Sequence, residues 1–485
     1  MKINPVVEAY GLRTFFAIGL SAALVFSAPQ PPTLSAFGGL FVLVLLAGAI
    51  VHIQLKREHL APQHRRPAER LVWLTVLLGV GGIFIVKKAV DGGIESDAAL
   101  LTAAPIIAQG LLIGGLIGGS IASTTVSLAV LLMGAAGAVA WPVLLAAWGL
   151  GVGGSFLISP LKKRQDLLRA VLVLFLTGAV VGAAVSLSRG FNLMGLGESA
   201  LWGAIACLIA ASIFWLGAAV MERLVGMTSD WTLLELCSPE HPLIQELCSK
   251  APGTYAHSVA VGNLAEAAAR SIGANPVICR AMAAFHDVGK VARPTCFIEN
   301  QRGQNIHDDL NPAFSARIII SHVSDGIAQA EKHRLPQILV DGIAQHHGTS
   351  LLAPFFYKAA QGCEVEEDME RLFRYPGPKP QTKEAAILHL ADSLEAASRT
   401  LNAKDDTNEF VNRMVERSRQ DGQLEDSDLT FRELQVIKDS FVSSLEALRH
   451  DRIAYPEPTT NEGPTPTLPV NSEPVIPETP ASASP

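Results

Sequence analysis

A run of 64 residues without a charged side chain, residues 98–161, constrains this chain more than any other feature. In ordinary soluble proteins roughly a quarter of the residues are charged. A helix needs about 20 predominantly apolar residues to cross a bilayer. The run therefore has room for three membrane helices joined by tight turns. Its small-residue stretches at 114–119 and 149–154 favour close contact between such helices.

Five further apolar segments predict membrane helices, approximately at residues 12–28, 34–55, 70–87, 167–187 and 200–220. The loops around 56–70 and 162–169 are basic, which places both of them on the cytoplasmic side. After the span at 70–87 an odd number of crossings must return the chain to that side, and three crossings fit the uncharged run whereas one does not. The sequence therefore predicts eight membrane helices with the amino terminus inside.

The charge balance divides the chain into two parts. Residues 1–225 contain 15 Lys and Arg against 9 Asp and Glu, whereas residues 226–485 contain 23 against 36. We therefore expect a transmembrane helical domain over 1–225 and a cytoplasmic soluble domain over 226–454. The acidic soluble part argues against a nucleic acid polymer as a partner, because nucleic acid binding needs a basic face. The lipid bilayer is the partner that the first part implies.

Helical spacing of apolar residues continues through the soluble part, from about Thr228 to Arg452, with few alternating segments. The remaining segment, 455–485, contains nine prolines together with Thr, Ser and Glu, and we expect it to be disordered. The predicted fold class is all-α: a polytopic transmembrane helix bundle, an all-helical soluble domain and a disordered Pro-rich tail.

Seven side chains of the soluble part form a candidate metal-binding set. A single histidine is more often structural than a ligand, but two adjacent doublets, His286-Asp287 and His346-His347, make this set more specific. Mixed imidazole and carboxylate ligands suit iron or manganese as well as zinc, and five imidazoles with two carboxylates suffice for two divalent ions. Two such ions activate a water and clamp phosphoryl oxygens during in-line attack. The seven are His257, His286, Asp287, His322, His346, His347 and Asp392.

Charged and aromatic side chains follow both doublets. Lys290 lies one helical turn after the first doublet, and we expect it to meet a phosphate and to act in catalysis with His286 and Asp287. Aromatic rings at 355–357 follow the second doublet, and stacking of a base on such a ring is worth about 1–3 kcal/mol. Tyr357 is therefore a candidate substrate contact, although packing of one helix on another explains each ring at least as well. The remaining histidines of the soluble part are assigned to structural or surface roles, although Asp308 and Asp309 follow His307.

The ordered set of motifs resembles the 7TM-HD phosphodiesterases, bacterial membrane proteins that degrade cyclic di-AMP. The resemblance is close over about residues 226–402 and extends to the architecture of the membrane part. The motifs that carry it are HPL at 241–243, APGTYAHS at 251–258, HDVGK at 286–290, FIENQ at 297–301, HDDLNP at 307–312, the segment from Ser315 to Gly326, HHGT at 346–349, RYPGPKP at 374–380 and ADSLEAA at 391–397.

The resemblance implies an HD-type phosphohydrolase domain whose seven matching residues bind two divalent metal ions, usually iron or manganese. It implies hydrolysis of the second messenger cyclic di-AMP to 5′-pApA at the bacterial cytoplasmic (inner) membrane, in a multi-pass protein with its catalytic domain in the cytoplasm. One departure concerns the outside of the membrane. Family members commonly carry a large extracytoplasmic domain after the first helix, and here only about residues 27–33 connect the first two spans.

Other functions stay open on the sequence alone. The substrate of the HD domain could be another nucleotide, cyclic di-GMP or guanosine tetraphosphate, although the Gly-Tyr-Pro signature of cyclic di-GMP enzymes does not follow His347. A non-catalytic nucleotide-binding membrane receptor is a second alternative, which the complete ligand set argues against. A transporter has little support, because residues 98–161 offer no ionisable group. A homo-oligomer is an open alternative for the quaternary state.

Overall fold

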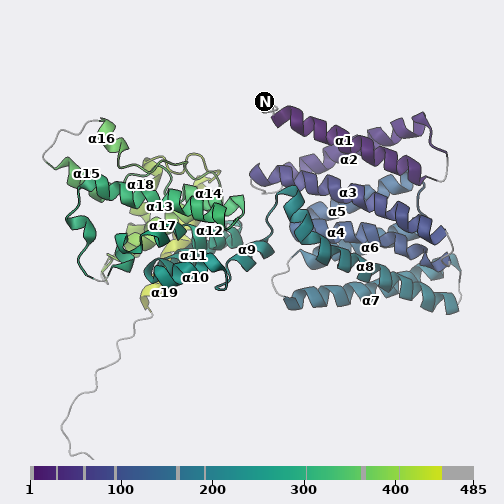
Figure 1. The fold of residues 1–485 in the computed structure, drawn as a ribbon. Coiled ribbons are helices and arrows are strands. Elements are labelled where there is room, and N and C mark those ends of the chain that lie inside the picture. Colours follow the sequence, from purple (N-terminus) through teal and green to yellow (C-terminus); the bar gives the residue numbers. More distant parts are fainter. Residues whose placement is uncertain are drawn as a thin grey trace, which may run out of the picture.

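The computed structural model describes residues 5–28, 31–57, 62–91, 96–159, 164–190, 193–301, 303–361, 367–402 and 405–450. These residues form helices, accompanied by one isolated β-bridge between Leu351 and Arg374. The predicted all-α fold class is confirmed, with an apolar bundle followed by a helical soluble part (Figure 1). The predicted tail at 455–485 lies outside the described residues.

Among the described residues, eight apolar helices make up the first part, at the places where the sequence predicts membrane spans. Six are long and apolar enough to cross a membrane, and two, over Arg13–Ser27 and Gly119–Ala135, are shorter. A short 3-10 helix, η1, precedes the fourth helix. The elements are α1 (Pro5–Ser27), α2 (Leu34–Arg57), α3 (Pro62–Asp91), η1 (Ser96–Ala103), α4 (Ala104–Leu116), α5 (Gly119–Ala135), α6 (Trp141–Ile158), α7 (Arg164–Arg189) and α8 (Leu193–Val225).

Close contact between backbones holds this bundle together, as the small-residue stretches predict. A Cβ atom added to Gly114 of α4 would lie 2.7 Å from the carbonyl oxygen of Ser155 in α6. The same holds between α7 and α8, where a Cβ on Gly203 would lie 2.3 Å from the carbonyl oxygen of Gly178. Not every predicted glycine takes part: a Cβ on Gly149 would meet nothing within 4 Å.

The soluble part is built around α11, which packs against α12, α17 and α19. Its core consists of fully buried side chains such as Phe285, Leu388 and Phe441. Short 3-10 helices follow α12 and carry the connection to α13. The elements are α9 (Asp230–Leu236), α10 (Pro242–Lys250), α11 (Pro252–Ile272), α12 (Pro276–Phe285), η2 (Val288–Ala292), η3 (Pro294–Cys296), η4 (Ile298–Asn300), η5 (Ile306–Asp308), α13 (Pro312–Lys332), α14 (Gln337–Gln345), α15 (Ala353–Ala360), α16 (Glu367–Arg371), α17 (Lys383–Ser398), α18 (Thr407–Gln420) and α19 (Phe431–His450).

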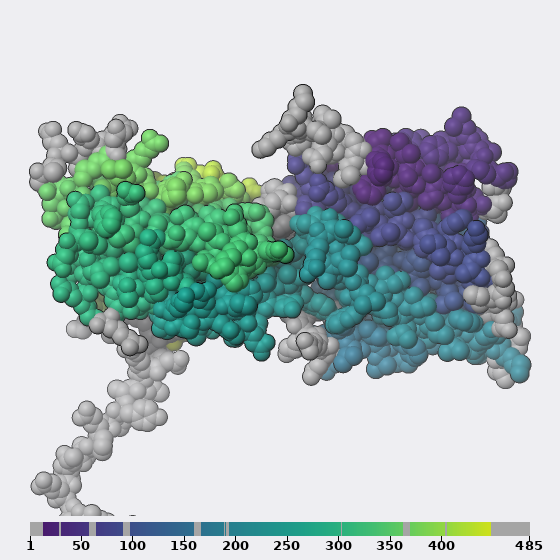
Figure 2. All heavy atoms as spheres, in the orientation of Figure 1, coloured from purple at the N-terminus to yellow at the C-terminus, as the bar shows by residue number. Residues whose placement is uncertain are grey.

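The two parts meet where α8 passes into α9, and Figure 2 shows them as two dense bodies joined near this point. The hydroxyl of Thr232 donates to a carboxylate oxygen of Glu222 at 2.6 Å, which ties the start of α9 to the end of α8. The ring centroid of Trp231 lies 6.3 Å from the ring centroids of Phe214 and Trp215. Polar and aromatic contacts therefore link the last membrane helix to the soluble part.

Candidate metal centre

All seven candidate metal ligands lie together in the soluble part, although five different helices or their ends carry them. His257 belongs to α11, His322 to α13 and Asp392 to α17. The two doublets stand directly after α12 and α14, where each helix ends and the chain turns. Within each of three groups the possible ligand atoms lie within 4.8 Å of one another. The groups are His322, His346 and His347; His257, His286 and Asp392; and His286, Asp287 and His346.

Asp287 lies between two sets of imidazoles. Its Oδ2 is 3.2 Å from Nε2 of His286 and 3.6 Å from Nε2 of His257. Its Oδ1 is 3.3 Å from Nε2 of His322 and 3.7 Å from Nε2 of His346. Each oxygen of this one carboxylate therefore faces a different pair of ring nitrogens, as a bridging ligand between two ions would.

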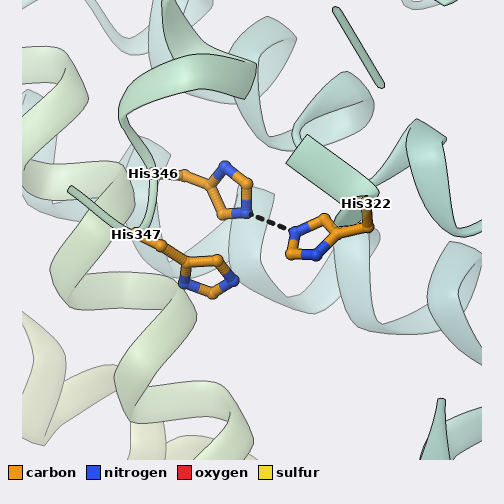
Figure 3. Close-up of side chains that lie close together, drawn as sticks. All are labelled: His322, His346 and His347. Carbon is orange, nitrogen blue, oxygen red and sulfur yellow. Dashed lines mark hydrogen bonds between the residues drawn. The ribbon is translucent and has the colours of Figure 1, made fainter. Parts of the chain in front are cut away.

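The hydrogen bonds of the rings orient their lone pairs toward the centre. Nδ1 of His286, His322 and His346 each donates to the carbonyl oxygen three residues earlier, at 2.8, 2.6 and 2.8 Å. Since a carbonyl only accepts, Nε2 of a neutral ring carries the lone pair. Nε2 of His322 and Nε2 of His346 face each other at 3.1 Å (Figure 3). Two opposed lone pairs repel each other unless a cation lies beside them, so this arrangement fits a metal ion.

Unpartnered buried atoms support the same fit. Nε2 of His286 and Oδ1 of Asp287 are buried and have no hydrogen-bond partner among the described residues. Leaving a buried polar atom unsatisfied costs about 1–3 kcal/mol, more for charged groups. Coordination to a cation would satisfy both atoms, and the donor set of imidazole and carboxylate suits a divalent metal.

The electrostatics divide the imidazoles into two kinds. Burial lowers the pKa of His322 and His346, and lowers that of His347 to about 3, so these three rings are neutral. Burial also opposes the charged forms of His257 and His286. Hydrogen bonds to Asp392 and Glu395 outweigh it for His257 and raise its pKa to about 9, and the negative charge of Asp287 and Asp392 raises the pKa of His286 to about 10. Protons on these two rings balance the acidic groups, and metal uptake would release them.

Lys290 is placed differently from a free phosphate-binding ammonium. Its Nζ lies 2.6 Å from Oδ2 of Asp287 and 2.9 Å from Oε1 of Glu299. The side chain is largely buried, over the ring of Phe297. The structure thus pairs Lys290 with two carboxylates beside the centre, and its contact with a substrate phosphate stays a prediction.

The aromatic residues at 355–357 lie apart from the ligands in the described contacts. Tyr357 is 63% exposed and its ring meets that of Phe356, which in turn packs on Phe373. Phe355 contacts His307, whose Nε2 donates to the carbonyl of Cys296 at 2.8 Å. This packing agrees with the alternative that these rings join one helix to another. The role of Tyr357 as a substrate contact stays a prediction.

Sequence reasoning missed two residues of the centre. The buried ring of Tyr375 stacks on His347, with 4.2 Å between ring centroids and an interplanar angle of 33°. Glu395 accepts a hydrogen bond from Nδ1 of His257, with 2.5 Å between the two atoms. Glu395 follows Asp392 by one helical turn, so the i, i+3 spacing on a predicted helix was a usable signal. Tyr375 lies in the RYPGPKP motif at 374–380, but nothing in that motif indicates that its ring contacts a histidine.

Two families match this chain in succession. The 7TM receptor with intracellular HD hydrolase matches residues 34–229, and the HD domain matches residues 254–397. These matches cover the membrane part from α2 onward and the elements that carry all seven candidate ligands.

Two curated relatives are named cyclic-di-AMP phosphodiesterase PgpH. The protein from Bacillus subtilis (strain 168) is 41% identical over 316 residues, which cover 64% of this chain and 44% of the relative. The protein from Listeria monocytogenes serotype 1/2a (strain 10403S) is 40% identical over 270 residues, which cover 55% of this chain and 37% of the relative. The matches thus span less than half the length of these relatives.

Crystal structures of the HD domain of L. monocytogenes phosphodiesterase PgpH are also similar, one alone and one in complex with cyclic-di-AMP. Both are 42% identical and cover 44% of this chain and 100% of the solved chain, with TM-scores of 0.41 and 0.42.

Proposed function

Because this chain belongs to the family of 7TM receptors with an intracellular HD hydrolase, we propose that it is a metal-dependent phosphodiesterase that hydrolyses cyclic di-AMP to 5′-pApA. The convergence of five imidazoles and two carboxylates on one buried centre carries this proposal. The substrate is supported by the names of the two curated relatives. The apolar helices make the chain a multi-pass membrane protein, and its basic loops support a cytoplasmic membrane with the HD domain in the cytoplasm.

Seven residues would hold the metal ions, which we propose to be two, of iron or manganese. His257, His286 and Asp392 form one position and His322, His346 and His347 the other, with Asp287 shared between them. Bound there, the ions would supply a nucleophilic water and positive charge for the phosphoryl oxygens.

The side chains themselves determine how a phosphodiester meets this centre. His347 is the most exposed of the seven, with 23% of its side chain accessible, so the substrate approaches from its side. Tyr375 fixes the ring of His347 by stacking on it. Burial of the remaining candidate ligands excludes bulk water, which strengthens electrostatic stabilisation of the negative charge on the phosphoryl oxygens. Attack of water on one phosphorus breaks its bond to a ribose 3′-oxygen, which takes up a proton, and leaves a 5′-phosphate.

Removal of metal from the full-length protein in detergent is expected to abolish hydrolysis of cyclic di-AMP, and Mn²⁺ or Fe²⁺ is expected to restore it. The reason is that the site offers imidazoles and carboxylates, which are ligands for divalent ions. Chromatographic detection of pApA, alongside metal analysis of anaerobically purified protein, measures both effects.

Cyclic di-GMP and guanosine tetraphosphate serve as comparison substrates in the same assay. A folded, metal-loaded protein that turns over neither cyclic di-AMP nor its comparators would refute the hydrolase proposal. Faster turnover of a comparator would reassign the substrate and keep the reaction class.

A Tyr375→Ala variant is expected to lower kcat/KM for cyclic di-AMP by about tenfold. An aromatic pair such as His347 and Tyr375 contributes about 0.5–1.5 kcal/mol beyond buried area, and its loss frees the most exposed ligand. Steady-state kinetics with saturating Mn²⁺ measure the change. Tyr375→Phe keeps the stacked ring and serves as the matched control, which should stay within twofold of the wild type.

The exposed Tyr357 is tested in the same series. Stacking of adenine on its ring would make Tyr357→Ala raise KM about fivefold or more, because base stacking is worth about 1–3 kcal/mol. Metal content and kcat should not change, since no described contact joins this ring to a ligand. An unchanged KM would remove Tyr357 from the substrate site.

A further inference from the structure

The seven ligands are supported in two different ways. Main-chain carbonyls accept from Nδ1 of His286, His322 and His346. His257 instead gives its Nδ1–H to the carboxylate of Glu395, which is not itself a candidate ligand, at 2.5 Å. Nδ1 of His347 lies 3.4 Å from Oδ2 of the candidate ligand Asp392. Glu395 is itself held by Arg399, whose guanidinium lies 3.0 and 3.1 Å from its two oxygens.

The negative charge is also divided unequally. Beyond the shared Asp287, the position formed by His257 and His286 includes Asp392, whose Oδ1 lies 3.0 Å from Nε2 of His257. Glu395 adds a second carboxylate directly behind that ring. The position formed by His322, His346 and His347 has three imidazoles, and Asp392 approaches it less closely, with Oδ2 at 3.4 Å from Nδ1 of His347. One of these three, His347, is also the most exposed ligand.

A carboxylate that accepts a hydrogen bond from a metal-binding imidazole fixes the ring and raises its basicity toward the metal. A carbonyl group, which carries no net charge, raises the basicity less. Outer partners of this kind typically change metal affinity by 10–100-fold. Added negative charge in a buried site acts in the same direction, because Coulomb attraction to a divalent cation is weakly screened there.

From this asymmetry, and resting on the proposed two-metal function, we infer that the two metal positions are unequal. The position of His257, His286 and Asp392 binds its ion more tightly, and Glu395 is the positioning residue that makes it so. The position of His322, His346 and His347 exchanges its ion more readily.

The ion pair of Glu395 with Arg399 does not explain the contact with His257. Arg399 directly follows the last residue of α17, one turn beyond Glu395, and about half of its side chain is exposed, as in an ordinary surface pair. A purely structural role for Glu395 would therefore appear as lower stability, with both metal affinities unchanged. The test needs a readout that separates these two roles.

Calorimetric titration of the metal-free, full-length protein in detergent with Mn²⁺ is that readout. The wild type is expected to show two dissociation constants at least tenfold apart. Glu395→Gln keeps an acceptor for Nδ1 of His257 but removes the charge, and should weaken the tighter constant about tenfold. Glu395→Ala removes both and should weaken it up to about 100-fold. The looser constant should stay within twofold in both variants.

His347→Ala assigns the positions, because it should abolish the looser binding event and keep the tighter one. Arg399→Gln keeps the contact of Glu395 with His257, and Glu331→Gln removes an exposed carboxylate from α13. Both controls should leave both constants within twofold. Glu395→Gln is nearly isosteric with the wild type. If Glu395→Ala does not fold, the tighter dissociation constant of Glu395→Gln decides the test.

Two equal constants in the wild type, or an unchanged tighter constant in Glu395→Gln, would overturn the inference while hydrolysis by the wild type continued. The proposed function fails differently: the wild type would then bind no Mn²⁺, or would bind it and hydrolyse no nucleotide. Activity of the wild type therefore separates the two failures.

Discussion

An Asp287→Asn variant is expected to lose bound metal and to hydrolyse cyclic di-AMP on the order of 1000-fold more slowly than the wild type. The two oxygens of Asp287 face four imidazole nitrogens at 3.2–3.7 Å, two on each side. An amide removes the negative charge and replaces one oxygen with an NH₂ group that cannot coordinate. Metal ions contribute several kcal/mol of transition-state stabilisation, and each 1.36 kcal/mol is a factor of ten in rate.

Metal content per protein molecule and kcat at saturating Mn²⁺ measure this effect. Circular dichroism shows whether the variant is folded, which we expect because Lys290 keeps Glu299 as a partner at 2.9 Å. Asp309→Asn is the matched control: this carboxylate is exposed, and its removal should change neither quantity. A folded Asp287→Asn protein with two bound ions and kcat within tenfold of the wild type would contradict the bridging role.

A Gly289→Ala variant is expected to destabilise the soluble part by about 3 kcal/mol or more. A Cβ at this position would lie 1.9 Å from the carbonyl oxygen of His322 and 2.5 Å from the backbone nitrogen of Gly326. Extra atoms in a packed core typically cost 1–3 kcal/mol, and here backbone atoms of α13 must move. For domains of this size about 2–4 °C of Tm is lost per kcal/mol, so Tm should fall by roughly 6–12 °C.

Differential scanning calorimetry of the full-length protein measures this shift, and metal content should fall with it, because α13 carries His322. Gly262→Ala is the matched control within α11. Its Cβ would lie 3.6 Å from Cβ of Ala283, an ordinary contact, and alanine favours a helix interior. Equal Tm values for Gly289→Ala and Gly262→Ala would show that η2 and α13 are further apart than the structure places them.

The membrane part was largely predictable from the sequence for a physical reason. Whether a segment can cross a bilayer depends on its own length and charge, and the positions of charged loops restrict how many crossings join them. These are properties of neighbouring residues, so the places of the eight helices follow without knowledge of packing. The sequence predicted that glycines would allow close contact between membrane helices such as α4 and α6. Which glycines contact a neighbouring helix depends on how each helix is rotated about its axis.

The chemistry of the centre was predictable only in part. Imidazoles and carboxylates in ordered motifs indicated a metal site, because few other functions require these residue types together. The motifs also implied which seven side chains converge. They did not show that Lys290 is paired with two carboxylates, or that Tyr375 and not Tyr357 stacks on a ligand.

By itself, then, the sequence determined the apolar helices, the helical class and the chemical types of the candidate ligands, because hydropathy, periodicity and side-chain chemistry are local. Only the tertiary structure decided how the ligands are supported. Glu395 and His257 stand 138 positions apart in the chain, and their contact exists because α17 packs against α11. Which oxygen of Asp287 faces which ring is likewise decided by the packing of four helices, a property that no single stretch of sequence contains.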